Sequence, residues 1–201
     1  PDMRPRSRVS SNAALLVTIA LLSSACARSR TAVRAEPVPT VTPAAAATPA
    51  ASLPSKSLIV PVQGVDPSRL RDTYTAGRGG GRTHDAVDIM APRGTPVIAA
   101  DDGTILKLRQ NAAGGITIYQ LDPDERFVYY YAHLDRYQTG LEEGGPVRQG
   151  QVLGFVGTTG NAPENVPHLH FQVMRYRGRG QYWGGEPVNP HPFFTRTGQR
   201  Q

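Results

Sequence analysis

The stretch GITIYQLDPDERFVYYYAHL, residues 115–134, contains two runs of strand-forming residues separated by a turn. Residues 115–121 and 126–134 are rich in β-branched and aromatic side chains, which favour strands. Between them, residues 122–125 read Asp-Pro-Asp-Glu and contain no apolar residue apart from the turn-forming proline. The stretch therefore predicts an antiparallel hairpin.

Similar apolar runs punctuated by glycine continue over residues 57–195, with no long amphipathic helix evident. The dipeptide Asp102-Gly103 favours a two-residue hairpin turn between the runs on either side of it. We therefore expect an all-β fold in which antiparallel sheets and hairpins form a single compact domain. Besides the first hairpin, strands are expected at residues 95–100, 104–108, 152–156 and 168–175.

The composition of the chain excludes several classes of protein. Of its 201 residues 39% are apolar, and 21 more are glycine, which is enough for one packed core. A single cysteine excludes an internal disulfide and a thiolate zinc site, so any metal must be held by histidine and carboxylate groups. The net charge of +6 is modest, and no long block of basic residues indicates a nucleic-acid partner.

The first 25 residues have the composition of an export signal. Three arginines precede the apolar run 13–22, and three small residues follow it. This run is too short to span a bilayer, which takes about 20 apolar residues. The next residue, Cys26, stands where bacterial lipoproteins carry their lipidated cysteine. We expect residues 1–25 to be a lipoprotein signal peptide and Cys26 to be lipidated; the alternative is cleavage nearby by an ordinary signal peptidase.

Residues 27–56 are dominated by alanine, proline and threonine and contain no aromatic residue. Such a segment buries too little apolar surface to fold, so we expect a disordered linker. The expected organisation is a signal peptide at 1–25, the linker at 27–56, a folded domain at 57–195 and a tail at 196–201.

Four of the five histidines lie in three short clusters within the expected domain. In the first cluster, His84 and Asp88 are four residues apart, so both lie on one side of a strand while Val87 and Ile89 face the core. An extended strand would separate their Cα atoms by about 13 Å. A shared metal ion therefore requires a backbone bend between them, which the small residue Ala86 favours.

The other two clusters also follow strand alternation. In the sequence His-Leu-His at 168–170, both imidazoles, His168 and His170, fall on one face. In the run 129–133 the same rule places His133 on the face of Tyr129 and Tyr131. Taken singly, each cluster also fits an ordinary half-exposed or edge strand.

Together, the clusters and their flanking segments resemble the lysostaphin/LytM-type zinc metallopeptidases, which cut peptide bonds in bacterial peptidoglycan. The resemblance covers about residues 77–190 and implies a β fold of the duplicated-hybrid-motif type with a groove. Its motifs are Gly81-Arg82-Thr83-His84 with Asp88, Ala91-Pro92-Arg93-Gly94-Thr95-Pro96-Val97, Tyr131-Ala132-His133-Leu134, Val147-Arg148-Gln149-Gly150-Gln151, Gly157-Thr158-Thr159-Gly160-Asn161 and Pro167-His168-Leu169-His170-Phe171.

The resemblance implies that His84, Asp88 and His170 bind one Zn²⁺ and that His133 and His168 are the catalytic pair. It implies a metalloendopeptidase that hydrolyses peptidoglycan peptides through metal-activated water. The bond cut stays open between a D-Ala-linked crosslink, the peptide stem and a glycine bridge. It also implies an exported protein, here a lipoprotein anchored to a membrane and facing the periplasm or cell wall.

The chain departs from the family pattern at three places. Ala86 replaces a glycine, Gln172 replaces a common glutamate, and the segment Ala162–Val166 lengthens the approach to the second histidine pair. None of these changes removes a ligand position. Because some proteins of this fold have lost their ligands and activate cell-wall amidases, a catalytically silent, cell-wall-binding activator is the alternative function. The sequence does not decide whether the protein has a regulatory protein partner.

Overall fold

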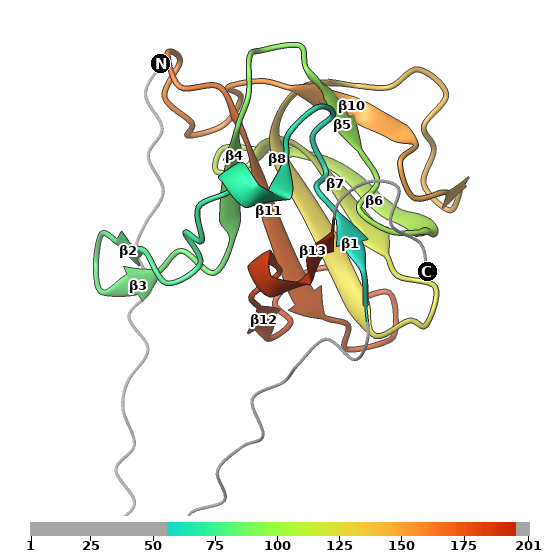
Figure 1. The fold of residues 1–201 in the computed structure, drawn as a ribbon. Coiled ribbons are helices and arrows are strands. Elements are labelled where there is room, and N and C mark those ends of the chain that lie inside the picture. The colour runs from blue at the N-terminus through green and yellow to red at the C-terminus, as the bar shows by residue number, and fades with distance from the viewer. Residues whose placement is uncertain (1–55, 196–201) are drawn as a thin grey trace, which may run out of the picture. The chain divides into compact units, whose positions relative to one another are not determined.

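The computed structural model describes residues 56–195, which form an all-β domain (Figure 1). The expected signal peptide, Cys26, the expected linker up to residue 55 and the tail at 196–201 lie outside the described residues. Within the described range the chain has thirteen strands and two short 3-10 helical turns, as the all-β prediction requires. No helix in this range is long and apolar enough to cross a membrane.

The strands range from two to eleven residues, and the longest, β8, lies near the centre of the main sheet. The 3-10 turns are η1 (Pro67–Arg69) and η2 (His191–Phe193). The strands are β1 (Leu58–Ile59), β2 (Gly77–Arg78), β3 (Arg82–Thr83), β4 (Val87–Met90), β5 (Pro96–Ile98), β6 (Gly103–Asn111), β7 (Gly115–Leu121), β8 (Phe127–Tyr137), β9 (Pro146–Val147), β10 (Val152–Val156), β11 (His168–Arg175), β12 (Pro187–Val188) and β13 (Phe194–Thr195).

A nine-stranded sheet carries the fold, with the order β12-β11-β8-β7-β6-β9 and with β4, β5 and β10 attached beside this path (Figure 1). The predicted hairpin is confirmed as β7 and β8. Its turn is stabilised by Asp122, whose carboxylate accepts the backbone N–H groups of Arg126 and Phe127 at 2.7 Å each. Strands β10 and β11 also have the predicted bounds.

The predicted hairpin around Asp102-Gly103 is wrong. Strand β5 pairs with β10, whereas β6 pairs with β7 and β9, so the dipeptide joins two strands that are not neighbours. Residues remote in sequence form hydrogen bonds with Asp102. Its carboxylate accepts the Gln149 N–H at 2.7 Å, and the Gln120 side-chain amide donates to its carbonyl at 3.2 Å. The two residues do not form the predicted turn, since Asp102 has no positive φ and Gly103, with a φ of 158°, is already part of β6. The pairing partners of the flanking strands are set by contacts remote in sequence.

The core lies on one face of β8 and β11, where alternate residues are fully buried. Tyr129 and Tyr131 of β8 pack against Phe171 of β11, with ring centroids 6.3 and 5.2 Å apart. Each fully buried large side chain contributes roughly 1.5–3 kcal/mol through the apolar area removed from water. The tyrosine hydroxyls stay hydrogen-bonded: that of Tyr131 donates to Gln120 Oε1 at 2.7 Å, and that of Tyr129 donates to Asp101 Oδ2 at 3.0 Å.

One strand pair departs from the antiparallel expectation. Strands β1 and β13 run parallel, with Leu58 opposite Phe194. A parallel pair needs a long connection, and here the connection is nearly the whole described domain. The two ends of the described segment are thus fixed to each other (Figure 1).

Candidate metal centre

Strands β4 and β11 bring Asp88 and His170 together. The two strands are antiparallel neighbours, and their register places these residues directly opposite each other. Side chains of such a pair share one face with Cβ atoms about 4.5–5.5 Å apart. Accordingly, His170 Nδ1 lies 3.0 Å from Asp88 Oδ1, while Leu169 and Phe171 turn into the core on the opposite face.

His84 reaches the same point because the backbone bends just after it. Asp85 adopts a left-handed conformation with φ of 57°, which aspartate tolerates better than most residues. Its carboxylate also accepts the Thr83 hydroxyl at 2.7 Å. The expected bend between His84 and Asp88 is therefore present, but it lies at Asp85. Ala86 has no positive φ, so alanine in place of the family's glycine causes no backbone strain there.

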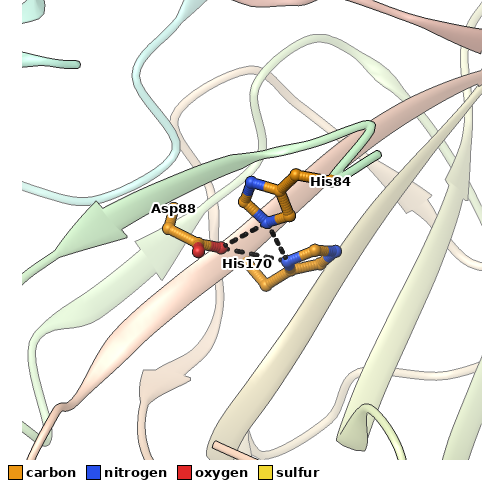
Figure 2. Close-up of side chains that lie close together, drawn as sticks. All are labelled: His84, Asp88 and His170. Carbon is orange, nitrogen blue, oxygen red and sulfur yellow. Dashed lines mark hydrogen bonds and ion pairs between the residues drawn. The ribbon is translucent and has the colours of Figure 1, made fainter. Parts of the chain in front are cut away.

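The three side chains form a compact donor set (Figure 2). His84 Nε2 lies 3.0 Å from Asp88 Oδ1 and 3.0 Å from His170 Nδ1. Ligands about 2.0–2.1 Å from a tetrahedral zinc ion are roughly 3.3 Å apart, so these separations fit a zinc site. Two imidazole nitrogens and one carboxylate oxygen are also the donors expected of a catalytic zinc site that keeps one position open.

Thr73 orients two members of this donor set. Its carbonyl accepts the His84 Nδ1–H at 2.9 Å, which leaves the Nε2 lone pair facing His170 and Asp88. Its hydroxyl oxygen accepts the Asp88 N–H at 3.0 Å. Outer groups of this kind fix the tautomer and ring orientation of a ligating histidine. Sequence reasoning missed Thr73, because it belongs to none of the motifs.

His133 lies beside the donor set because strand β8 contains a bulge. Between Tyr131 and Leu134 the strand has one residue more than its partner β7, and His133 takes a left-handed φ of 61°. The extra residue turns His133 away from the core face of Tyr129 and Tyr131, so the predicted common face is wrong. The His133 ring centroid lies 5.0 Å from that of His168 and 5.7 Å from that of His170.

Both remaining histidines are held by backbone carbonyls. His133 Nδ1 lies 2.8 Å from the carbonyl oxygen of Thr159, and His168 Nδ1 lies 2.8 Å from that of Val166. As a carbonyl only accepts, each imidazole donates from Nδ1, and Nε2 is left to exchange a proton. His168 Nε2 lies 3.9 Å from Asp88 Oδ1, at the edge of the donor set.

Burial and charge set the ionisation of the site. Burial alone raises the pKa of Asp88, but hydrogen bonds with His170 and His84 outweigh it and hold that pKa well below its usual range. Burial lowers the pKa of His133 to about 4 and also lowers the pKa of His170. The site at neutral pH therefore combines an ionised carboxylate with a neutral His133 imidazole.

Two small cavities open onto the histidines. One, of about 300 Å³, is lined by His84, Asp88, His133 and His168, and the other, of about 140 Å³, by His133, His170 and Trp183. The lengthened segment at 162–166 lines part of the first cavity, through Ala162, Pro163 and Val166. Arg78, another residue outside the recognised ligand set, lines both cavities and places a guanidinium nitrogen 3.5 Å from Asp88 Oδ2.

The chain is similar in sequence to known proteins. The L-Ala--D-Glu endopeptidase of Bacillus subtilis is 35% identical over 120 residues, which are 57% of this chain and 36% of that protein. The glycyl-glycine endopeptidase ALE-1 of Staphylococcus capitis is 33% identical over 126 residues, 62% of this chain and 32% of that protein. The chain thus matches about a third of the length of these curated relatives.

A solved structure and a family profile extend the comparison. The catalytic domain of lysostaphin from Staphylococcus simulans superposes with a TM-score of 0.50 at 32% identity, covering 62% of this chain and 87% of that domain. The sequence profile of peptidase family M23 matches residues 82–190, which include all five site residues. Since this match spans more than half of the chain, the protein belongs to peptidase family M23.

Proposed function

We propose that the chain is a zinc-dependent metalloendopeptidase that hydrolyses peptide bonds of bacterial peptidoglycan. The observation that carries this proposal is the convergence of His84 Nε2, Asp88 Oδ1 and His170 Nδ1 at separations of 3.0 Å. Two further imidazoles lie beside this set without belonging to it. The relatives support the substrate class, because those named above are endopeptidases whose names specify peptide bonds.

The proposed ligands of one zinc ion are His84, Asp88 and His170. When bound there, zinc supplies Lewis-acid chemistry: it lowers the pKa of a water molecule to about 7 and polarises the scissile carbonyl. The ionised Asp88 contributes one negative charge, so a site with two neutral imidazoles keeps a net positive charge toward the substrate.

His133 and His168 are the proposed catalytic pair. Each is fixed through Nδ1 by a backbone carbonyl, so Nε2 is oriented before substrate arrives. A neutral Nε2 accepts a proton from the attacking water, and a protonated one returns it to the leaving amine or donates a hydrogen bond to the developing oxyanion. Burial keeps His133 in the accepting form, since its pKa of about 4 is far below neutral pH.

We further propose that the protein is exported and tethered. The support is the composition of residues 1–25, the position of Cys26 and the composition of the linker at 27–56. Residues 1–55 lie outside the described structure, so these features are known from the sequence alone. Replacing Cys26 by serine should release the protein from the membrane fraction. Unchanged membrane association of Cys26→Ser would contradict the lipid anchor.

The alternative is a silent cell-wall-binding activator of an amidase. Such a role requires no catalytic machinery, yet all three ligand positions and both catalytic positions are occupied by the expected residue types. The hydrolase is therefore the better-supported function.

Digestion of purified peptidoglycan by the full chain tests the proposal. Peptides released by the zinc-loaded protein are identified by mass spectrometry, which also names the bond cut. We expect release by the unsubstituted chain and none by His170→Ala. Absence of release despite one bound zinc per chain would contradict the hydrolase and favour the activator.

A further inference from the structure

We propose that Arg69 and Arg71 form a carboxylate-binding subsite next to the metal centre, which makes the substrate an acidic peptide. This inference rests on the proposed function and adds a specificity that neither the family nor the five site residues determine. The two arginines line a cleft beside Asp88 that contains no histidine in its lining.

The cleft has a volume of about 810 Å³ and is lined by Val65, Arg69, Leu70, Arg71, Asp88 and Met90, among other residues. This volume is within the range of about 300–1,000 Å³ that is usual for ligand sites. Asp88 is shared with the metal centre, so a peptide with its scissile bond at the histidines can continue into the cleft. The lining combines apolar side chains with two guanidinium groups and the carboxylates of Asp66 and Asp88.

The segment that carries the two arginines is fixed to the metal centre. Thr73, two residues after Arg71, contacts both His84 and the backbone of Asp88. Leu70, between the arginines, packs against the hydrophobic core. The backbone positions of the two arginines relative to the proposed zinc ligands are therefore set by the fold.

Within residues 56–195, the arginines that form ion pairs are Arg78, Arg93, Arg126, Arg136 and Arg175, and neither arginine of the cleft is among them. The carboxylates that line the cleft are engaged elsewhere. Asp66 accepts the N–H and the hydroxyl of Ser68 at 2.8 and 2.7 Å, and Asp88 faces the histidines. Arginine is always charged and pairs with carboxylates through two parallel hydrogen bonds, so the ligand that suits this cleft is a carboxylate.

This charge distribution discriminates between the bonds left open above. A peptide stem that contains D-glutamate or ends in D-alanine offers free carboxylates close to its peptide bonds, whereas the interior of a glycine bridge offers none. We therefore infer that the stem or its crosslink, and not a glycine bridge, occupies the cleft.

The test compares a synthetic stem peptide with free carboxylates and the same peptide with every carboxylate converted to a carboxamide. Binding of each is measured by calorimetry to the metal-depleted full chain, in which no cleavage perturbs the titration. The double variant Arg69→Gln/Arg71→Gln is compared with Arg148→Gln/Arg177→Gln, which removes the same charge from exposed positions that do not line the cleft. Circular dichroism verifies that each protein is folded.

We expect the unsubstituted chain and the control variant to bind the acidic peptide at least about tenfold more tightly than the amide, as a charge-assisted hydrogen bond predicts. The cleft variant should bind the two peptides equally. Equal binding by the unsubstituted chain, or retained preference in the cleft variant, would overturn the subsite. Cleavage by the zinc-loaded chain is scored separately, so a failure of the proposed hydrolase is distinguished from a failure of the subsite.

Discussion

Asp88 uses its two carboxylate oxygens for different partners. Oδ1 faces His84 and His170 at 3.0 Å, whereas Oδ2 lies 3.5 Å from the guanidinium group of Arg78. The first oxygen is thereby directed at the proposed metal position and the second away from it. Arg78 is thus placed to hold the orientation of a ligand without being one.

The division between ligands and catalytic histidines makes a residue-level prediction. His133→Ala and His168→Ala should each keep one bound zinc while hydrolysis falls by about 10²–10⁴, the usual contribution of a general acid or base. The reason is that neither imidazole belongs to the donor set. The zinc content of each variant is measured by elemental mass spectrometry. Peptide release from peptidoglycan is measured on the same samples.

His191→Ala is the matched control. Its Nε2 lies 3.3 Å from the Leu70 carbonyl oxygen, and it is not part of the donor set, so zinc content should stay unchanged. Loss of zinc in His133→Ala as complete as in His170→Ala would contradict the division of roles.

That the five residues proposed for the site lie close together was predictable from residue type and motif, but the groups that orient them were not. His84, Asp88 and His170 were assigned through a resemblance, and the structure brings them together. Thr73 has no motif of its own, because its contribution is a carbonyl and a hydroxyl delivered by a loop. Such contacts depend on how distant segments pack, which spacing along the chain does not record.

At the scale of elements, the bulge in β8 depends on close backbone contact with the loop at 157–161. Thr159 accepts the Ile116 N–H at 2.9 Å and donates its hydroxyl to the Leu134 carbonyl at 2.6 Å, so it bridges β7 and β8 at the bulge. Its own carbonyl holds His133. The next residue, Gly160, has a φ of 75° and lies against the backbone of Gly115.

Gly160→Ala should therefore lower both stability and activity. A Cβ at this position would overlap the backbone of residues 113–115, and the displaced loop would carry the Thr159 carbonyl away from His133. Gly140→Ala is the matched control, since Gly140 has a similar φ of 82° but no atom within 4 Å of the added Cβ.

We expect Gly140→Ala to cost about 1–2 kcal/mol of unfolding free energy, the penalty of a left-handed alanine, with activity unchanged. Gly160→Ala should cost more and should lower kcat. Chemical denaturation and peptide release measure the two effects. Equal losses of unfolding free energy and of activity in the two variants would show that the loop does not position His133.

The same scale separates what sequence patterns predict from what they do not. The β7–β8 hairpin was predictable because its strands and its turn are contiguous. The pairing partner of β5 was not predictable, because it is the remote strand β10. The face on which His133 lies was not predictable either, because a single extra residue in β8 changes it. Alternation predicts a side chain's face only where the strand has no bulge.

At the scale of the whole domain, Lys56 fixes the first described residues to the turns of the sheet. Its ammonium group lies 3.0 Å from Asp101 Oδ2, 3.0 Å from Asp122 Oδ2 and 3.4 Å from Asp124 Oδ2. The Asp122 side chain is fully buried. Burial alone lowers the pKa of Lys56, but the adjacent carboxylates of Asp122 and Asp101 outweigh it, and the pKa is raised.

Because the pKa of Lys56 is higher in the folded protein than its ordinary value near 10.5, the charged lysine stabilises the fold at pH values below 10.5. This contribution is lost as the pH rises through the pKa of Lys56 in the folded protein. Lys56→Met should therefore cost on the order of 3 kcal/mol at pH 7, because it leaves a buried carboxylate without its counter-ion. The difference in Tm between the two proteins should shrink above pH 10.5.

Lys107→Met is the control, as Lys107 pairs with Glu143 on the surface and should contribute about 0–1 kcal/mol. Thermal melts from pH 7 to 11 provide the measurement. A Tm difference for Lys56→Met that is as small as that for Lys107→Met, or that does not change with pH, would contradict the role of this ion-pair cluster.

One zinc ion, held by His84, Asp88 and His170, is proposed to make the protein a peptidoglycan hydrolase. The most direct measurement is titration of zinc into the metal-depleted full chain while the release of peptides from purified peptidoglycan is followed. The proposal predicts that peptide release rises with added zinc and saturates at one equivalent of zinc per chain. The His170→Ala variant should release no peptides when about one equivalent of zinc is added. Full release in the presence of a chelator, or one tightly bound zinc in His170→Ala, would contradict it.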